Sequence, residues 1–339
     1  MIRLLAISTL FFSWAKPALA AKLFKGENCA ACHTAIRDAS PVEDFKAKDH
    51  GRADVIVIGG GLSGLTAAYS LKGLKVVVLE KEGHTGGKTR RESLGRWTHP
   101  TGAVYFAKPY GRIETLFKEL EIYPKKFKNP LHNYWTPDGI ITDWISKEGI
   151  AQLPQSRTAG PALQKFIAKL EEFSHLDALT LPIQESDQKT LAELDSISFN
   201  DYLLRDFGPE AAALGDEYAH DVFGAGAKDY SAALGIMYMC MEFTDAYSWP
   251  GGLGEVAATL TKKLGAAVRL EALVEQVIQD PAGVRVIYRH GKNRYEMRAK
   301  AAVIAVPSMV ARRIIKGLSP RKEKALAAVR YSSYALVPM

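Results

Sequence analysis

Residues Val55–Gly64 read VIVIGGGLSG, and this stretch decides how the chain folds. Its first four residues are apolar and β-branched, which is typical of a strand that is buried on both faces of a parallel sheet. Three glycines follow at once, and residues 65–72 predict a helix that ends at Gly73. Residues 75–79 predict a second buried strand. The order of strand, glycine turn, helix and strand indicates an α/β unit.

Gly59, Gly61 and Gly64 have the spacing of a dinucleotide-binding turn, and the acidic residue Glu80 follows at the end of the second strand. In such a turn the first glycine permits the sharp bend, and the third lets helix and strand pack closely. The second, Gly61, lets a pyrophosphate approach the backbone at the helix N-terminus. We expect Glu80 to accept hydrogen bonds from the ribose hydroxyls of an adenosine. The alternative interpretation is a glycine-rich turn that binds no ligand.

The residues after Glu80 read KEGHTGGKTR and contain the glycine doublet Gly86 and Gly87, followed by Lys88. Over most of residues 53–315 the chain resembles the flavin-containing amine oxidase superfamily, in which the ribose acid precedes such a doublet and a basic residue. The resemblance implies that the coenzyme is FAD. The family usually has arginine where this chain has lysine, which keeps the charge but lacks the planar bidentate fork. We expect Arg90 or Arg91 to compensate.

The resemblance also implies contacts farther along the chain. Thr101, Gly102 and Ala103 would run along the flavin ring, and the backbone of Val274 would pair with the adenine edge. The turn Trp249–Glu255 matches the one that returns the family's chain to the coenzyme domain. The predicted coenzyme contacts are Gly59, Gly61, Leu62, Ser63, Gly64, Glu80, Lys81, Gly86, Gly87, Lys88, Thr101, Gly102, Ala103 and Val274. No catalytic acid or base is assigned.

The predicted fold class is α/β. A Rossmann-like FAD-binding domain has a parallel sheet with an inserted β-hairpin or meander, and an α+β substrate domain accompanies it. Alternating residues predict the hairpin around Gly291, and residues 302–307 predict the next parallel strand. The predicted segments are a signal peptide (1–20), a C-x-x-C-H segment with its linker (21–52), the FAD-binding domain (53–104 and 246–310), the substrate domain (105–245) and the start of a returning substrate-domain segment (311–339).

The family resemblance implies that the chain is incomplete at its C-terminal end. No second acidic and glycine motif follows Pro307. Family members continue with a flavin-binding strand and a helix whose N-terminus faces the flavin pyrimidine edge. We therefore expect either that another chain supplies this part or that FAD binds weakly and this chain alone is inactive.

The first residues predict export from the cytoplasm. Residues 4–15 are apolar behind Arg3, and a small-residue pattern ends at Ala20, which is typical of a secretory signal cleaved before Ala21. The run is too short for a stable membrane span, which needs about 20 residues. A twin-arginine pair is absent from this leader, so we expect a Sec-type signal and a periplasmic or otherwise exported protein.

The segment Cys29-Ala30-Ala31-Cys32-His33 has the C-x-x-C-H form of a covalent c-type haem site. In such a site both thiols bind the haem and the histidine, here His33, is an iron ligand. The alternatives are a Cys29–Cys32 disulfide and a vestigial motif. Residues 34–52 have little apolar periodicity and predict a solvated tether.

The composition is that of a folded protein, with 47% hydrophobic and 24% charged residues among 339. The net charge of +7 is spread along the chain, so no basic block favours nucleic acid as a partner. The sequence therefore predicts an exported FAD-dependent oxidoreductase of amine-oxidase type, which transfers a hydride from a small organic substrate to flavin N5. The alternatives are a flavin and c-type haem electron-transfer protein with a redox partner, an inactive family member, and a desaturase or isomerase of a lipid-like substrate.

Overall fold

The structure is a computed structural model that describes residues 47–127, 133–175, 179, 185–243 and 245–331. The predicted signal peptide and the C-x-x-C-H segment, with Cys29, Cys32 and His33, lie outside the described residues. The described chain divides into two compact units. The first unit contains residues 47–88 and 257–329, and the second contains residues 89–256 and 330–331. The sequence predicts the corresponding boundaries after residues 104 and 245.

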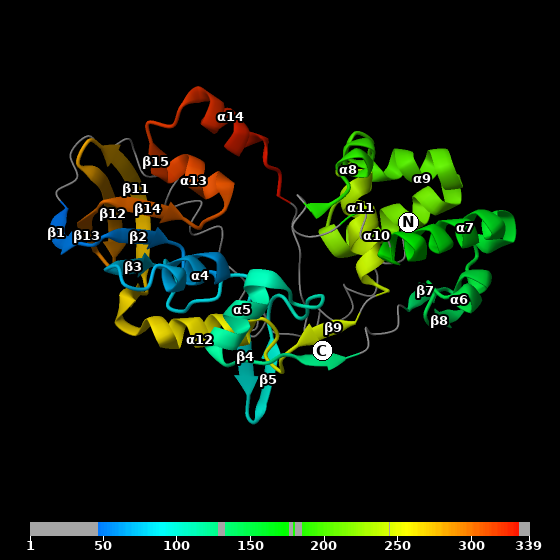
Figure 1. The fold of residues 1–339 in the computed structure, drawn as a ribbon, viewed down its shortest axis with the longest axis horizontal. Coiled ribbons are helices and arrows are strands. Elements are labelled where there is room, and N and C mark those ends of the chain that lie inside the picture. Colours follow the sequence, from blue (N-terminus) through cyan, green and yellow to red (C-terminus); the bar gives the residue numbers. More distant parts are fainter. Residues whose placement is uncertain (1–46, 128–132, 176–178, 180–184, 244, 332–339) are drawn as a thin grey trace, which may run out of the picture. The chain divides into compact units, whose positions relative to one another are not determined.

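A four-stranded parallel sheet in the order β10-β3-β2-β14 is the centre of the first unit (Figure 1). Its strands are β2 (Val55–Ile58), β3 (Val76–Leu79), β10 (Val268–Arg269) and β14 (Ala301–Ile304). Helix α4 (Leu62–Ser70) connects β2 to β3. The predicted succession of strand, glycine turn, helix and strand is thereby confirmed, with the helix beginning at Leu62.

Both faces of the parallel sheet are covered, which explains the continuous apolar run in β2. Val55 and Val57 pack with Ala68 of α4 on one face. Ile56 and Ile58 pack against a second sheet on the other face. Successive side chains of a strand point to opposite faces, so a strand between two layers must be apolar at every position.

The second sheet of this unit has the order β1-β13-β12-β11-β15. Its strands are β1 (Lys48–Arg52), β11 (Ala272–Asp280), β12 (Gly283–His290), β13 (Asn293–Ala299) and β15 (Ile315–Lys316). The three middle strands form an antiparallel meander, and the edge strands β1 and β15 pair in parallel with their neighbours. The predicted hairpin around Gly291 is the β12–β13 connection. The unit also contains η2 (Gly265–Ala267), α13 (Ser308–Ile314), α14 (Pro320–Ala328) and most of α12 (Gly254–Leu264).

The predicted tether is wrong for its last five residues, because Lys48–Arg52 form β1. All five residues are exposed, so no apolar pattern marks the strand. Backbone pairing with β13 and the side chain of His50 hold β1 in place. The His50 ring nitrogen Nδ1 hydrogen-bonds the hydroxyl of Tyr288, and the rings of His50 and Tyr295 lie 4.8 Å apart.

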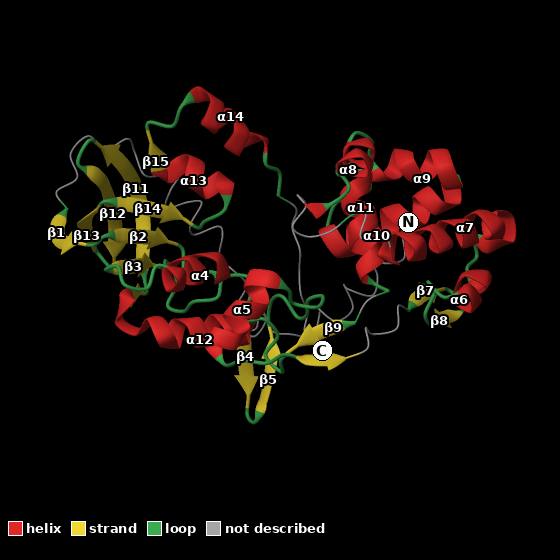
Figure 2. Ribbon diagram, in the orientation of Figure 1, coloured by secondary structure: helices red, strands yellow, loops and turns green. Residues whose placement is uncertain are grey.

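The second unit is mostly helical (Figure 2). Its helices are α5 (Gly111–Leu120), α6 (Lys147–Gln152), α7 (Ser156–His175), α8 (Gln188–Asp195), α9 (Phe199–Phe207), α10 (Pro209–Phe223) and α11 (Ala232–Met241). Its strands pair as β4 (Arg91–Leu94) with β5 (Trp97–Pro100), β6 (Lys125–Phe127) with β9 (Ala246–Ser248), and β7 (Tyr134–Thr136) with β8 (Gly139–Ile141). No helix among the described residues of either unit is long and apolar enough to cross a membrane.

The core of the second unit lies between α7, α9, α10 and α11. Phe199 is fully buried at the start of α9, and a Cβ at Gly235 of α11 would overlap its ring. The helices therefore approach closely at this position. Ser198 caps α9 by accepting a 3.0 Å hydrogen bond from the Asp201 amide.

Candidate dinucleotide-binding site

The glycine turn lies at the carboxyl end of β2, directly before α4. The neighbouring strand β3 ends beside it at Leu79, and Glu80 follows. In open α/β sheets, ligands bind outside the carboxyl ends of the parallel strands. The turn and Glu80 thus occupy the edge of the sheet where a dinucleotide is expected.

Two of the three predicted glycines are required by packing alone. Gly59 has a φ of +105°, and a Cβ there would lie 2.6 Å from the carbonyl oxygen of Ala305. A Cβ at Gly64 would overlap the carbonyl oxygen of Gly59. Both positions hold the turn against β14 and α4, so larger residues would displace the backbone whether or not a ligand binds.

Gly61 differs from the other two, because no atom lies within 4 Å of where its Cβ would be. Its φ of −72° and ψ of 175° suit any residue. The fold therefore does not demand glycine here, which fits the prediction that a ligand approaches the backbone at this position. Gly61 is the N-cap of α4, and no side chain caps this helix. The first-turn amides, including those of Leu62 and Ser63, are left to bind an anion such as a pyrophosphate.

Glu80 is buried and braces the turn. One carboxylate oxygen accepts a 2.6 Å hydrogen bond from the amide of Gly60, and the other accepts a 2.9 Å bond from the amide of Glu82. A carboxylate has about four acceptor positions, so these two bonds leave capacity for ribose hydroxyls. A Cβ at Gly60 would lie 2.9 Å from that of Glu80. Gly60 is thus a site residue that the sequence prediction missed, because the motif allows any residue there.

The glycine doublet lies beside the turn, as the family resemblance implies. The amide of Gly86 donates a 2.9 Å hydrogen bond to the carbonyl of Gly60, and Gly86 forms a parallel bridge with Gly61. A Cβ at Gly87 would approach the Cα of Gly61 to 3.3 Å. Lys88 follows with an exposed side chain. The two glycine segments are therefore in contact, with a cation directly after them.

The side chain of Lys81, another predicted contact, forms an ion pair with Glu82. Because the side chain is paired, the backbone of Lys81 is the part that we expect to contact the coenzyme next to Glu80. Arg91 is one of the two arginines that we expect to compensate for the lysine at position 88. Its side chain also forms an ion pair, with Glu255 in the second unit. Among these basic residues, Lys88 is the one that directly follows the glycine doublet.

Backbone hydrogen bonds join the predicted adenine contact to Glu80. The Glu80 amide donates to the carbonyl of Arg269 at 2.9 Å, and the Ala272 amide donates to the carbonyl of Glu80 at 2.7 Å. Val274 lies two residues farther along β11 and is buried. A register shift between Val274 and Gln276 interrupts the pairing with β12 at this point. The first unit thus brings Val274 close to the residue that is predicted to bind the ribose.

Thr101, Gly102 and Ala103 belong to the second unit, as does the turn Trp249–Glu255. The Leu253 amide donates a 3.1 Å hydrogen bond to the carbonyl of Ala103. Within the described residues, the buried hydroxyl of Thr101 has no hydrogen-bond partner, and neither does the indole nitrogen of Trp249. A buried polar atom without a partner costs about 1–3 kcal/mol, so these two atoms fit a site that a ligand completes.

The family model for flavin-containing amine oxidoreductases matches residues 62–337. The chain belongs to this family. The Rossmann-like α/β fold of the family is therefore confirmed, and membership implies FAD as the coenzyme. The glycine turn, the uncapped helix and Glu80 fit an adenine dinucleotide. As for metals, no cluster of three His, Cys, Asp or Glu side chains suited to one occurs in the part of the chain that the structure describes.

Several known proteins are similar to this amine oxidoreductase chain. The L-amino-acid oxidase of Demansia vestigiata is 25% identical over 303 residues, which are 82% of this chain and 56% of that protein. The L-amino-acid oxidase of Echis ocellatus is 25% identical over 306 residues, which are 83% of this chain and 57% of that protein. The chain thus spans little more than half the length of these relatives.

Solved structures share the fold. Putrescine oxidase bound to putrescine has a TM-score of 0.63 at 19% identity, over 83% of this chain and 64% of that one. Cyclohexylamine oxidase from Brevibacterium oxydans has a TM-score of 0.60 at 22% identity, over 81% of this chain and 63% of that one. At these identities the likeness concerns the fold alone.

Proposed function

We propose that this protein is an exported FAD-dependent oxidoreductase that transfers a hydride from a small organic amine or amino acid to flavin N5. The observation that carries the proposal is Gly61, whose missing side chain opens onto the uncapped N-terminus of α4. A pyrophosphate accounts for both features. The names of the relatives and neighbours, which are oxidases of amino acids and amines, support the substrate class.

Each part of the site has a role in holding the coenzyme. The α4 N-terminus and its amides bind the pyrophosphate, because the helix dipole and the free N–H groups favour an anion. Glu80 binds the ribose, and its brace on Gly60 fixes the carboxylate before the coenzyme arrives. Bound FAD supplies the hydride acceptor, while the protein orients it and excludes water.

A methyl group added at Gly61 tests coenzyme binding. Gly61→Ala keeps an allowed backbone and meets no protein atom, so we expect the purified full chain to fold normally while its affinity for FAD falls on the order of 100-fold. Gly160→Ala is the matched control, since its Cβ meets only Ser156 at 3.8 Å. Calorimetric titration with FAD and circular dichroism give the two readouts. The proposal fails if the folded wild-type chain takes up no FAD, or if Gly61→Ala binds it equally well.

The substrate class is tested on the FAD-loaded protein without oxygen. Primary amines, diamines and L-amino acids are added separately, and loss of the oxidised flavin absorbance reports hydride transfer. We expect at least one of these compounds to bleach the flavin. Bleaching by none of them, in protein that binds FAD stoichiometrically, would reject the substrate class without rejecting the coenzyme.

The C-x-x-C-H motif supports a second candidate function, in which electrons leave the flavin through a covalent haem and pass to a redox partner. An absorption spectrum of the exported protein after denaturation separates the two functions, because covalent haem stays with the chain whereas non-covalent FAD is released. Haem absorbance that disappears in Cys29→Ser would support the second function. Released flavin alone supports the first, and the absence of both chromophores supports an inactive family member.

A further inference from the structure

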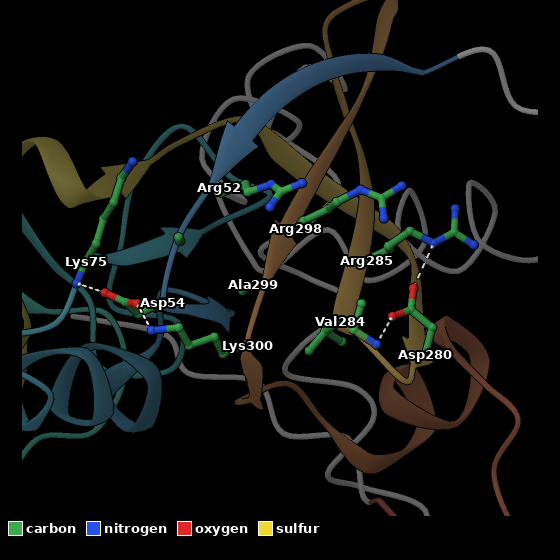
Figure 3. A pocket seen from close by; sticks show the side chains of 11 residues that line it. Arg52, Asp54, Lys75, Asp280, Val284, Arg285, Arg298, Ala299 and Lys300 are labelled. Carbon is green, nitrogen blue, oxygen red and sulfur yellow. Dashed lines mark hydrogen bonds and ion pairs between the residues drawn. The ribbon is translucent and has the colours of Figure 1, made fainter.

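A pocket of about 370 Å³ lies at the amino ends of the same parallel strands, in the first unit (Figure 3). Asp54 directly precedes β2, Lys75 precedes β3 and Lys300 precedes β14, and all three line it. The glycine turn follows the carboxyl end of β2, one strand length away. A four-residue strand spans about 13 Å, so a ligand in this pocket is not part of the coenzyme.

The wall of the pocket carries a row of three arginines on three adjacent strands. Arg52 of β1 lies opposite Arg298 of β13, and Arg298 lies opposite Arg285 of β12. Neighbouring strands are about 4.8 Å apart, and like charges that face each other across strands are destabilising. The fold therefore keeps three cations together at a cost that a bound anion would remove.

The acids of the protein neutralise this row only in part. Glu296 lies between two of the arginines and accepts from Arg298 at 2.8 Å and from Arg285 at 3.2 Å. Asp280 adds a contact of 3.5 Å to Arg285. Arg52, by contrast, has no acidic partner among the residues that the structure describes. One end of the row is thus free to bind a ligand.

The rest of the pocket adds to the positive charge. Lys300 pairs with Asp54 at 2.8 Å, and Lys75, whose backbone amide donates to Asp54, also lines the pocket. Counting Glu296, the pocket has five cationic and three acidic side chains, which leaves an excess of two positive charges. The five cations are Arg52, Lys75, Arg285, Arg298 and Lys300.

We propose that this pocket binds a small molecule that carries two or more phosphate groups. Guanidinium groups bind phosphate oxygens through paired, charge-assisted hydrogen bonds, and three of them in a row match neighbouring phosphates better than a single anion. The volume is within the range of small-molecule pockets and exceeds what one inorganic ion needs. A soluble diphosphate ester and the headgroup of a diphosphate lipid share this chemistry. The proposal stands independently of the function at the glycine turn.

The experiment uses the full chain loaded with FAD, titrated with inorganic pyrophosphate in a calorimeter. We expect saturable binding to one site, tighter than that of inorganic phosphate. Arg52→Gln and Arg298→Gln should each weaken pyrophosphate on the order of tenfold, because each removes charged hydrogen bonds. Arg321→Gln is the matched control, since it removes the same charge from an exposed position on α14 outside the pocket. Vesicles that contain cardiolipin, with two phosphates in its headgroup, form the second arm.

Arg52 is exposed, so Arg52→Gln still tests the site if Arg298→Gln fails to fold. Vesicle binding that Arg52→Gln abolishes would support the proposal and identify the lipid headgroup as the source. The proposal is overturned if neither pyrophosphate nor the vesicles bind, or if Arg321→Gln weakens binding as much as Arg52→Gln does. Tighter binding of an acidic peptide than of pyrophosphate would also overturn it, in favour of a protein partner. FAD affinity should be unchanged in Arg52→Gln, which separates this result from the test of function.

Discussion

The two ends of one parallel sheet present different kinds of site. At the carboxyl end, glycines, backbone amides and the single acid Glu80 form the turn, and the segments involved lie within about 30 residues except for Val274. At the amino end, long cationic side chains from β1, β12 and β13 form the pocket, and Arg52 lies far from Arg298 in the sequence. The difference shows that local sequence can encode a backbone site, whereas a side-chain site of this kind depends on strand register.

The largest expected effect is at Gly64, and it tests whether the turn is fixed by packing. Gly64→Val would bring side-chain atoms against the carbonyl oxygen of Gly59 and toward Ala305. We expect the first unit to lose more than about 3 kcal/mol of stability, measured by denaturant unfolding. Gly61→Ala is the control and should unfold as the wild type does. An unchanged midpoint for Gly64→Val would mean that the turn and β14 are not closely packed.

A smaller effect is expected at Glu80, where stability and binding change together. Glu80→Gln replaces a carboxylate that accepts from two backbone amides with a group that has one acceptor oxygen. One amide loses its partner, so we expect a loss of about 1–3 kcal/mol and FAD affinity reduced on the order of tenfold. Calorimetry with FAD and denaturant unfolding measure both. Glu82→Gln removes the same charge from a side chain that is partly exposed and should change stability by less than about 1 kcal/mol.

The smallest effect concerns β1, the strand that carries Arg52 of the pocket. Burial, then the charge of Arg269 and then His290, lower the pKa of His50, while Asp49 opposes them. The unfolded chain therefore takes up the proton first, and the stability that neutral His50 contributes is lost as pH falls below about 6.5. Unfolding midpoints from pH 7.5 to 5 should fall more steeply for the wild type than for His50→Gln. Parallel curves for the two proteins would show that protonation of His50 does not loosen β1.

The sequence predicted the elements whose pattern is local. The continuous apolar run before Gly59 predicted β2, because a strand that is buried on both faces is apolar at every position. The alternation of apolar and polar residues around Gly291 predicted the β12–β13 hairpin, because a strand that is buried on one face is apolar at every second position. The spacing of the glycines likewise predicted the sharp turn at Gly59 and the close packing of helix and strand at Gly64. These features need no knowledge of the distant chain.

Three features could not be predicted from the sequence, for physical reasons. Every residue of β1 is largely exposed, so no apolar pattern marks the strand, and its pairing rests on backbone groups and on the contacts of His50 with Tyr288 and Tyr295. The brace on Gly60 falls at a position that the motif leaves open. The row formed by Arg52, Arg285 and Arg298 exists only because two strand registers align them. In each case the determining contact is tertiary.

The open face of Gly61 has a consequence for how such proteins diverge. Packing requires glycine at positions 59 and 64, so we expect selection to maintain both in any descendant that still folds, whereas under the proposed function it would maintain Gly61 only while the coenzyme is used. A lineage that abandons redox chemistry would accumulate alanine or serine at this position first, with the neighbouring glycines unchanged. Under the proposed function, a substitution at position 61 beside unchanged Gly59 and Gly64 would therefore mark a relative that no longer uses the coenzyme.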